Sequence, residues 1–261
     1  MTYDELPTLD TLWLNAAGWR IFARTAVIPN SLRPPVVLVH GLGVSSRYLV
    51  PTARRLACEF SVYAPDLPGF GRSERPRRAL NVPQLAETLL AWMDAARLER
   101  AALLGNSLGC QIIAEAAIQQ PARVTQAVLV GPTIDAQARS AVRQLWRLVK
   151  DIPREPLSLV PIVAWDYLRC GLPRAWRTLQ FALEDRIETK APHLHCPTLV
   201  VNGEHDPLVP HAWAELVARL APQGRLVIIS GAGHASIYSS PETLVRLVRE
   251  FLKSTTSRDH D

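Results

Sequence analysis

The chain has few lysines and cysteines and no long apolar run. Its 261 residues include four cysteines, Cys58, Cys110, Cys170 and Cys196, none of them in a Cys-x-x-Cys pair. This scattered spacing argues against a zinc cluster and, in a cytosolic chain, favours free thiols over disulfides. No stretch approaches the roughly 18 apolar residues that a membrane helix needs. We therefore expect neither a metal site nor a membrane partner.

Basic residues exceed acidic ones by 29 to 24, for a formal net charge of +5. Only Lys150, Lys190 and Lys253 are lysines, so almost all of the positive charge belongs to arginines spread along the chain. A nucleic-acid binder would need a basic stripe with interleaved aromatic residues, or a known binding motif. The chain has neither, and we expect no nucleic-acid partner.

The segment Met1–Glu5 carries acidic residues where a secretory signal needs positive charge, and no long apolar segment follows it. A cytoplasmic location is therefore the expectation. The composition, 48% apolar and 20% charged, is typical of a globular protein. A chain of this length can form one domain with a large buried core. A monomer or a homodimer is expected.

One short motif, Gly105-Asn106-Ser107-Leu108-Gly109, fits the pattern Gly-x-Ser-x-Gly. The apolar run Ala101–Leu104 before it predicts a buried strand, and Leu108–Gln119 behind it predicts a helix. A serine on such a sharp turn has an exposed hydroxyl, beside N–H groups of the helix start that stabilise developing negative charge. The alternative, that Ser107 only caps a helix, leaves both flanking glycines unexplained. The motif predicts a nucleophilic serine.

Two later loops contain an acid and a base. The expected strand Thr198–Val201 leads to Asp206, and the expected strand Leu226–Ile229 leads to His234. A serine is a poor nucleophile at its ordinary pKa and needs an adjacent base, which in turn needs an orienting carboxylate. We predict that His234 takes the proton of Ser107 and that Asp206 orients the imidazole.

Other residues compete for these roles. Asp135 follows the preceding expected strand, and Glu204 lies close to Asp206, so either could be the acid. Cys110 stands three residues after Ser107, although small buried cysteines are common. The other histidines are His40, His193, His195, His205, His211 and His260. Only His234 follows the last expected strand in a loop bracketed by glycines.

Two further loops complete a family pattern. The expected strand Val36–Val39 runs into His40-Gly41-Leu42-Gly43, and the segment Asp66–Ser73 follows the next strand. Together with the order Ser, Asp, His, these segments resemble the α/β-hydrolase superfamily over about residues 18–253. The resemblance implies a serine hydrolase with a catalytic triad and no metal or cofactor. It also implies an oxyanion hole formed by the N–H groups of Leu42 and Leu108.

The predicted elements alternate between strand and helix, which favours an α/β fold: a mostly parallel, twisted sheet with helices on both faces. The expected strands are Trp19–Val27, Val36–Val39, Phe60–Ala64, Ala101–Leu104, Ala127–Val130, Thr198–Val201 and Leu226–Ile229. The expected helices are Arg47–Cys58, Pro83–Ala96, Leu108–Gln119, Ala212–Leu220 and Pro241–Leu252.

This alternation breaks over residues 132–191, called the insert below. Residues 1–131 and 192–261 are then the hydrolase core, and the insert is a helical cap between two of its strands. Trp146, Trp165 and Trp176 lie in the insert, and we expect them to contact the substrate as an apolar roof. The alternative is that they pack the insert against the core.

These features predict a serine hydrolase that cleaves carboxylic esters of small molecules with a partly hydrophobic acyl or alcohol group. Thioesterases, lactonases and amidases would use the same residues. Asn106 before the serine is also typical of carbon–carbon bond hydrolases of ring-cleavage products. Those enzymes usually carry a Gly-Pro-Gly-type stretch where this chain has Val44-Ser45-Ser46. A non-catalytic ligand receptor on the same fold is a third possibility.

Overall fold

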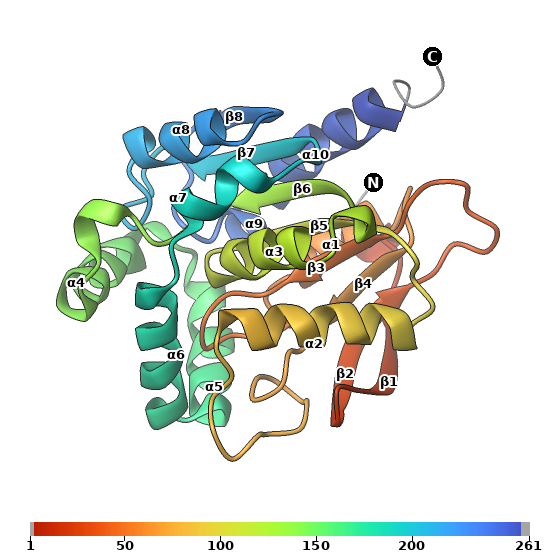
Figure 1. Ribbon diagram of the computed structural model, residues 1–261, viewed down its shortest axis with the longest axis horizontal. Helices are drawn as coiled ribbons and strands as arrows, with labels where there is room; N and C mark the ends of the chain where they lie inside the picture. Colours follow the sequence, from red (N-terminus) through yellow and green to blue (C-terminus); the bar gives the residue numbers. More distant parts are fainter. Residues whose placement is uncertain (1–2, 257–261) are drawn as a thin grey trace.

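A computed structural model describes residues 3–256 and contains one eight-stranded sheet (Figure 1). Its strand order is β1-β2-β4-β3-β5-β6-β7-β8. β1 pairs with β2, and β2 with β4, in antiparallel fashion, and the remaining pairs are parallel. The strands are β1 (Asp10–Ala16), β2 (Trp19–Ala26), β3 (Val36–Val39), β4 (Val62–Pro65), β5 (Ala101–Asn106), β6 (Val124–Val130), β7 (Thr198–Gly203) and β8 (Gly224–Ile229).

Helices cover both faces of the sheet, and an apolar core fills each side. Leu85, Ile113 and Val217 belong to the core on one face, whereas Leu56 and Val248 belong to the other. In Figure 1, α2 and α3 cross in front of the strands. The helices outside the insert are α1 (Val50–Leu56), α2 (Val82–Ala95), α3 (Leu108–Gln119), α8 (His211–Leu220), α9 (Ser236–Ser239) and α10 (Pro241–Thr256).

The central strands are apolar throughout because both of their faces are covered. All four residues of β3 and all six of β5 are buried. Near-continuous apolar runs of this kind are typical of parallel strands between two helical layers. The expected α/β architecture with a mostly parallel sheet is confirmed.

The segment between β6 and β7 contains α4 (Ala141–Asp151), α5 (Val160–Cys170), α6 (Leu172–Glu184) and α7 (Ile187–Lys190). The first three lie together on the left of Figure 1. A buried hydrogen bond of 2.6 Å from Ser45 Oγ to Asp166 Oδ2 fastens α5 to the core. No helix within residues 3–256 has the length and apolar character needed to cross a bilayer.

Two elements differ in particular from the sequence-based expectation. β1 was not expected, because its sequence is a short apolar run, Leu12-Trp13-Leu14, between polar residues, and only Ala16 is buried. The helix expected over Arg47–Cys58 spans only Val50–Leu56. The preceding residues form turns instead, with Tyr48 N–H donating to Ser45 O and Leu49 N–H to Ser46 O.

Candidate active site

Ser107 lies on the turn between β5 and α3, with φ 58° and ψ −121°. A non-glycine residue rarely adopts this left-handed region, and such strain persists only where the surroundings impose it. Here the surroundings are tight: a Cβ at Gly109 would lie 2.4 Å from Val39 O, and one at Gly105 would lie 2.6 Å from the carbonyl carbon of Gly109. The two glycines therefore let α3 pack directly against the sheet.

His234 and Asp206 form a buried pair at the ends of β8 and β7. The distance from His234 Nδ1 to Asp206 Oδ2 is 2.7 Å. The other carboxylate oxygen accepts from Leu208 N–H at 2.8 Å and from Val209 N–H at 3.0 Å. The Asp206 carboxylate is therefore held by three hydrogen bonds. Because Nδ1 of His234 donates its hydrogen to Asp206, the other ring nitrogen, Nε2, is free to accept a proton.

Gly131, directly after β6, lies against this pair. Its φ is +56°, and a Cβ there would lie 3.1 Å from His234 Cε1 and 3.2 Å from Asp206 Oδ2. Any larger residue would therefore strain the backbone and press on the imidazole and its carboxylate at once.

Several charges act on the His234 imidazole. Burial lowers its pKa, but the Asp206 carboxylate, its hydrogen bond, and the charges of Asp151 and Glu155 outweigh burial and raise the pKa to about 9. Asp151 Oδ1 accepts from His234 N–H at 3.2 Å, and Glu155 Oε1 accepts from Ala235 N–H at 2.7 Å. Both carboxylates also line the cavity described next, and burial raises the pKa of each.

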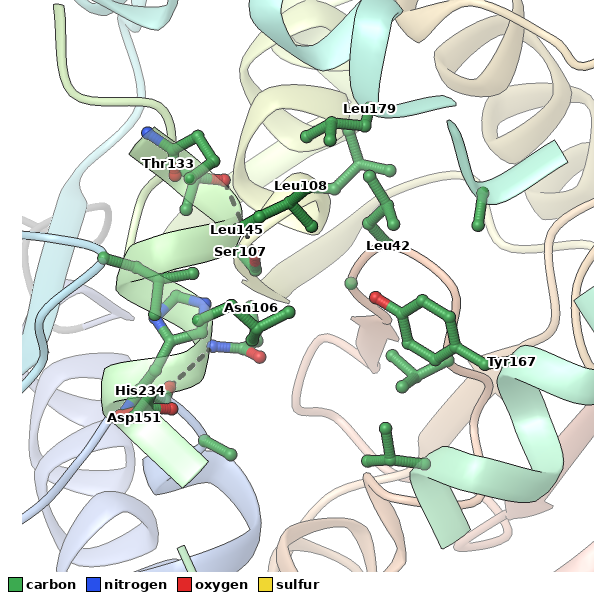
Figure 2. A pocket seen from close by; sticks show the side chains of 18 of the residues that line it. Leu42, Asn106, Ser107, Leu108, Thr133, Leu145, Asp151, Tyr167, Leu179 and His234 are labelled. Carbon is green, nitrogen blue, oxygen red and sulfur yellow. Dashed lines mark hydrogen bonds between the residues drawn. The ribbon is translucent and has the colours of Figure 1, made fainter. Parts of the chain in front are cut away.

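Ser107 and His234 face one cavity of about 690 Å³ (Figure 2). Ser107 Oγ lies 3.5 Å from Thr133 Oγ1, and His234 Nε2 is buried with no hydrogen-bond partner among residues 3–256. A direct Ser107–His234 hydrogen bond is not formed here. Such bonds are often long in structures without substrate and tighten in the complex.

The oxyanion-hole candidates, Leu42 and Leu108, also line this cavity. Their two segments are tied together by Tyr48, whose hydroxyl accepts from Gly41 N–H at 3.0 Å and donates to Asn106 Oδ1 at 2.9 Å. The Asn106 amide then donates to Val130 O at 3.0 Å and to His234 O at 3.3 Å. Asn106 thus joins three loops of the site.

The insert forms most of the apolar wall of the cavity, but the expected aromatic roof is wrong in part. Trp176 lines the cavity, whereas Trp146 and Trp165 are absent from its lining and are 60% and 50% exposed. On α4 and α5, the buried positions include Gln144 and Asp166. Trp146 is two positions from Gln144, and Trp165 is one position from Asp166. Side chains at these spacings lie on different faces of a helix, so both tryptophans point away from the buried face. The wall also includes Leu145, Leu148, Val163, Tyr167 and Leu179.

The comparisons with known proteins agree with this fold. The model of the Alpha/beta hydrolase family matches residues 36–247, which is most of the chain. The chain belongs to the alpha/beta hydrolase family.

Individual members of this family resemble the chain along nearly its whole length. A pyrrolizixenacetamide deacetylase from Xenorhabdus hominickii is 26% identical over 247 residues, which cover 85% of this chain and 91% of the relative. A thermophilic esterase from Thermogutta terrifontis has a TM-score of 0.79 at 23% identity, over 94% of this chain and 99% of that one. A 2-hydroxy-6-oxo-6-phenylhexa-2,4-dienoate hydrolase from Rhodococcus has a TM-score of 0.78 at 22% identity, over 94% of this chain and 100% of that one.

In this alpha/beta hydrolase the rival residues have other partners. Asp135 accepts from Gln137 N–H and pairs with Arg147 at 2.8 Å. The ring of His40 is satisfied at both nitrogens, by Leu67 N–H at 3.0 Å and Gly41 O at 2.9 Å. Cys110 is buried, and burial raises the pKa of its thiol. His260 lies outside the described residues. The remaining rivals are exposed: Glu204, His193, His195, His205 and His211.

Sequence reasoning missed the roles of Tyr48, Gly131, Asp151 and Glu155. Asp151 precedes His234 by 83 residues, and Glu155 precedes Ala235 by 80. Neither carboxylate stands in a motif, so the sequence carries no signal for this contact. Gly131, directly after an expected strand, is the only one of the four that a local pattern could have indicated.

Proposed function

We propose that the chain is a serine hydrolase that cleaves carboxylic esters through an acyl-enzyme on Ser107. One observation carries the proposal: Ser107, on its strained turn, shares a cavity with the unpartnered Nε2 of His234, whose Nδ1 contacts Asp206 at 2.7 Å. A nucleophile, a base and an orienting acid in this relation are what acyl transfer requires.

In the proposed reaction, Ser107 Oγ attacks the ester carbonyl carbon and its proton moves to His234 Nε2. The N–H groups of Leu42 and Leu108 stabilise the oxyanion, and each such donor is typically worth about 3–4 kcal/mol in the transition state. The imidazolium then protonates the departing alcohol. Water, deprotonated by His234, releases the acid from Ser107. The reaction is complete without a metal or an organic cofactor.

The cavity supports a substrate with a hydrophobic portion. Apart from the catalytic groups, its wall consists largely of leucine, isoleucine, valine and aromatic side chains, most of them from the insert. Each buried methylene contributes roughly 0.8 kcal/mol to binding. We therefore assign the insert as a cap that covers Ser107 and excludes water. The esterase and the deacetylase among the similar proteins are compatible with acyl transfer.

The main alternative is cleavage of a carbon–carbon bond, which Asn106 before the serine favours. A dienoate is the substrate class of the similar Rhodococcus hydrolase, and such a carboxylate needs a cation to bind it. Within residues 3–256, the cavity lining contains no arginine or lysine but does contain Asp151 and Glu155. These acids repel an anionic substrate, so the ester is the better proposal.

The test is turnover of p-nitrophenyl acyl esters, with lactones and a ring-cleavage dienone in the same panel. Ser107→Ala is expected to reduce kcat by at least about 10³ with unchanged circular dichroism, because the triad acts as a unit. More than about one per cent residual kcat in that variant contradicts the assignment. A wild type that releases p-nitrophenol only once per molecule indicates a receptor instead.

A further inference from the structure

The exposed apolar side chains of this molecule are concentrated in the insert. Apart from Trp13, Val27 and Leu32, every large hydrophobic side chain that is exposed within residues 3–256 lies between positions 142 and 176. We call this set the cap patch. Its members are Val142, Leu145, Trp146, Leu148, Val149, Ile152, Leu157, Val160, Trp165, Leu168, Leu172 and Trp176. A concentration of exposed apolar side chains in one segment is a candidate interaction site.

The helix α4 is inverted relative to an ordinary surface helix. Its buried positions include the polar residues Gln144 and Asp151, which are 5% and 4% exposed. Val142 and Trp146, by contrast, are 78% and 60% exposed. A helix that packs on a core normally buries its apolar face and exposes its polar one. The apolar face of α4 therefore lacks a partner within residues 3–256.

The next helix also exposes apolar side chains. α5 packs Val163 and Tyr167 against the core and Asp166 is bound to Ser45, yet Trp165 and Leu168 are exposed. Figure 1 shows α4 and α5 on the same side of the molecule. The two exposed apolar faces thus belong to one end of the fold, formed by the insert.

The cap patch is continuous with the mouth of the catalytic cavity. Leu145, Ile152 and Leu172 are exposed to solvent and also line the cavity that contains Ser107. These three side chains thus connect the exposed apolar surface with the apolar wall of the cavity.

Within the segment 141–177, which contains the cap patch, the exposed charges are all positive. Between positions 141 and 177 the acids are Asp151, Glu155 and Asp166, and each is buried or lines the cavity. The exposed cations Arg143, Lys150, Arg154 and Arg177 have no acidic partner within ion-pair distance among residues 3–256. The segment that carries the cap patch thus combines exposed tryptophans and aliphatic residues with positive charges that form no ion pair within residues 3–256.

We propose that the cap patch docks on an anionic phospholipid surface, with the cavity mouth opening onto the lipid. Helices with tryptophan and leucine on one face and basic residues beside them lie in the interface between headgroups and acyl chains. Each cation near an anionic surface strengthens binding about fivefold. A second copy of this chain is a poorer occupant, because a two-fold contact of the patch with itself would bring like charges together.

Flotation with vesicles tests the docking. The lipids are the ether-linked analogues of either phosphatidylglycerol or phosphatidylcholine, so that they offer no carboxylic ester to hydrolyse. The wild type is expected to float with phosphatidylglycerol, much less with phosphatidylcholine, and less at high salt. The triple variant Trp146→Ser, Trp165→Ser, Leu168→Ser and the double variant Arg143→Gln, Lys150→Gln are each expected to partition at least about tenfold more weakly.

Leu32→Ser is the matched control, because Leu32 is exposed on the β2–β3 loop outside the insert. It should float like the wild type. All variants should hydrolyse p-nitrophenyl acetate at the wild-type rate, which shows that they fold and separates docking from the chemistry of Ser107. Failure of the wild type to float, or equal flotation of all the variants, overturns the proposal. A wild-type dimer that the triple variant converts to monomer by sedimentation assigns the cap patch to a second copy instead.

Discussion

At the scale of single residues, Asp206 is distinguished from its rival Asp135 by its partners. Asp206 contacts the His234 ring, whereas Asp135 pairs with Arg147. Asp206→Asn is therefore expected to reduce kcat roughly 10⁴-fold, because an amide favours the wrong imidazole tautomer. Asp135→Asn is the matched control and should change kcat by less than about tenfold. Steady-state kinetics on one p-nitrophenyl ester measures both. The reverse order of effects would move the acid to the loop after β6.

The charges around His234 predict a pH dependence. A base must be neutral to accept a proton, and the pKa of His234 is raised to about 9. We expect kcat/KM to rise with pH and to level off above about 9. Asp151→Asn removes a negative charge that favours the imidazolium, so the midpoint should shift to lower pH. Glu204→Gln changes an exposed carboxylate on the same loop as Asp206 and should leave the midpoint of the pH profile unchanged. An unchanged midpoint in Asp151→Asn would show that Asp151 does not act on the imidazole.

A residue of the candidate site can be predicted from the sequence only if the residues next to it in the chain form a recognisable motif. Ser107, Asp206 and His234 each follow an apolar strand in a recognisable loop, so local patterns were sufficient to indicate them, and the structure brings the acid and the base into contact. Tyr48 acts through Asn106, which is 58 residues away. A contact of that kind depends on the fold and leaves no trace in local sequence.

At the scale of elements, the helices of the insert were predicted as a group but their orientation was not. Composition indicates that aromatic residues gather there, yet only the packing of each helix decides which of them face the cavity. The inverted burial of α4 could not be foreseen, because an amphipathic pattern is normally read with its apolar side inward.

This orientation predicts which tryptophan limits the acyl chain. Trp176 lines the cavity and Trp146 does not. Trp176→Ala should therefore raise kcat/KM for longer acyl chains relative to short ones, by up to about fourfold for each extra methylene accommodated. Trp146→Ala should leave the chain-length profile unchanged on soluble esters. The comparison needs only a series of p-nitrophenyl esters from acetate upward. Identical profiles for both variants would mean that Trp176 is a packing residue.

The strands show the same limit of prediction. Buried central strands such as β3 and β5 have continuous apolar runs and were located from the sequence, although β5 ends two residues later than expected. β1 escaped prediction because half of its side chains face solvent and its place in the sheet comes from pairing with β2. Long-range pairing, rather than local preference, decides such an edge strand.

At the scale of the whole molecule, the parallel order of the sheet assembles the site. β5, β7 and β8 run in the same direction, so Ser107, Asp206 and His234, which follow them, meet at one edge of the sheet. Loops at the carboxyl ends of parallel strands are where open α/β sheets bind their ligands. The alternation of elements predicts this class of fold, but the strand order depends on contacts far apart in the sequence.

The central claim, that Ser107 is the nucleophile, is tested most directly by covalent labelling. The protein is incubated with an alkyl fluorophosphonate, and the adduct is located by peptide mass spectrometry while ester hydrolysis is followed in the same sample. The account predicts one adduct per chain, on Ser107, formed in step with loss of hydrolysis and absent in Ser107→Ala. An adduct on another residue that tracks the loss of activity, or a Ser107→Ala variant that still labels and still hydrolyses esters, would contradict it.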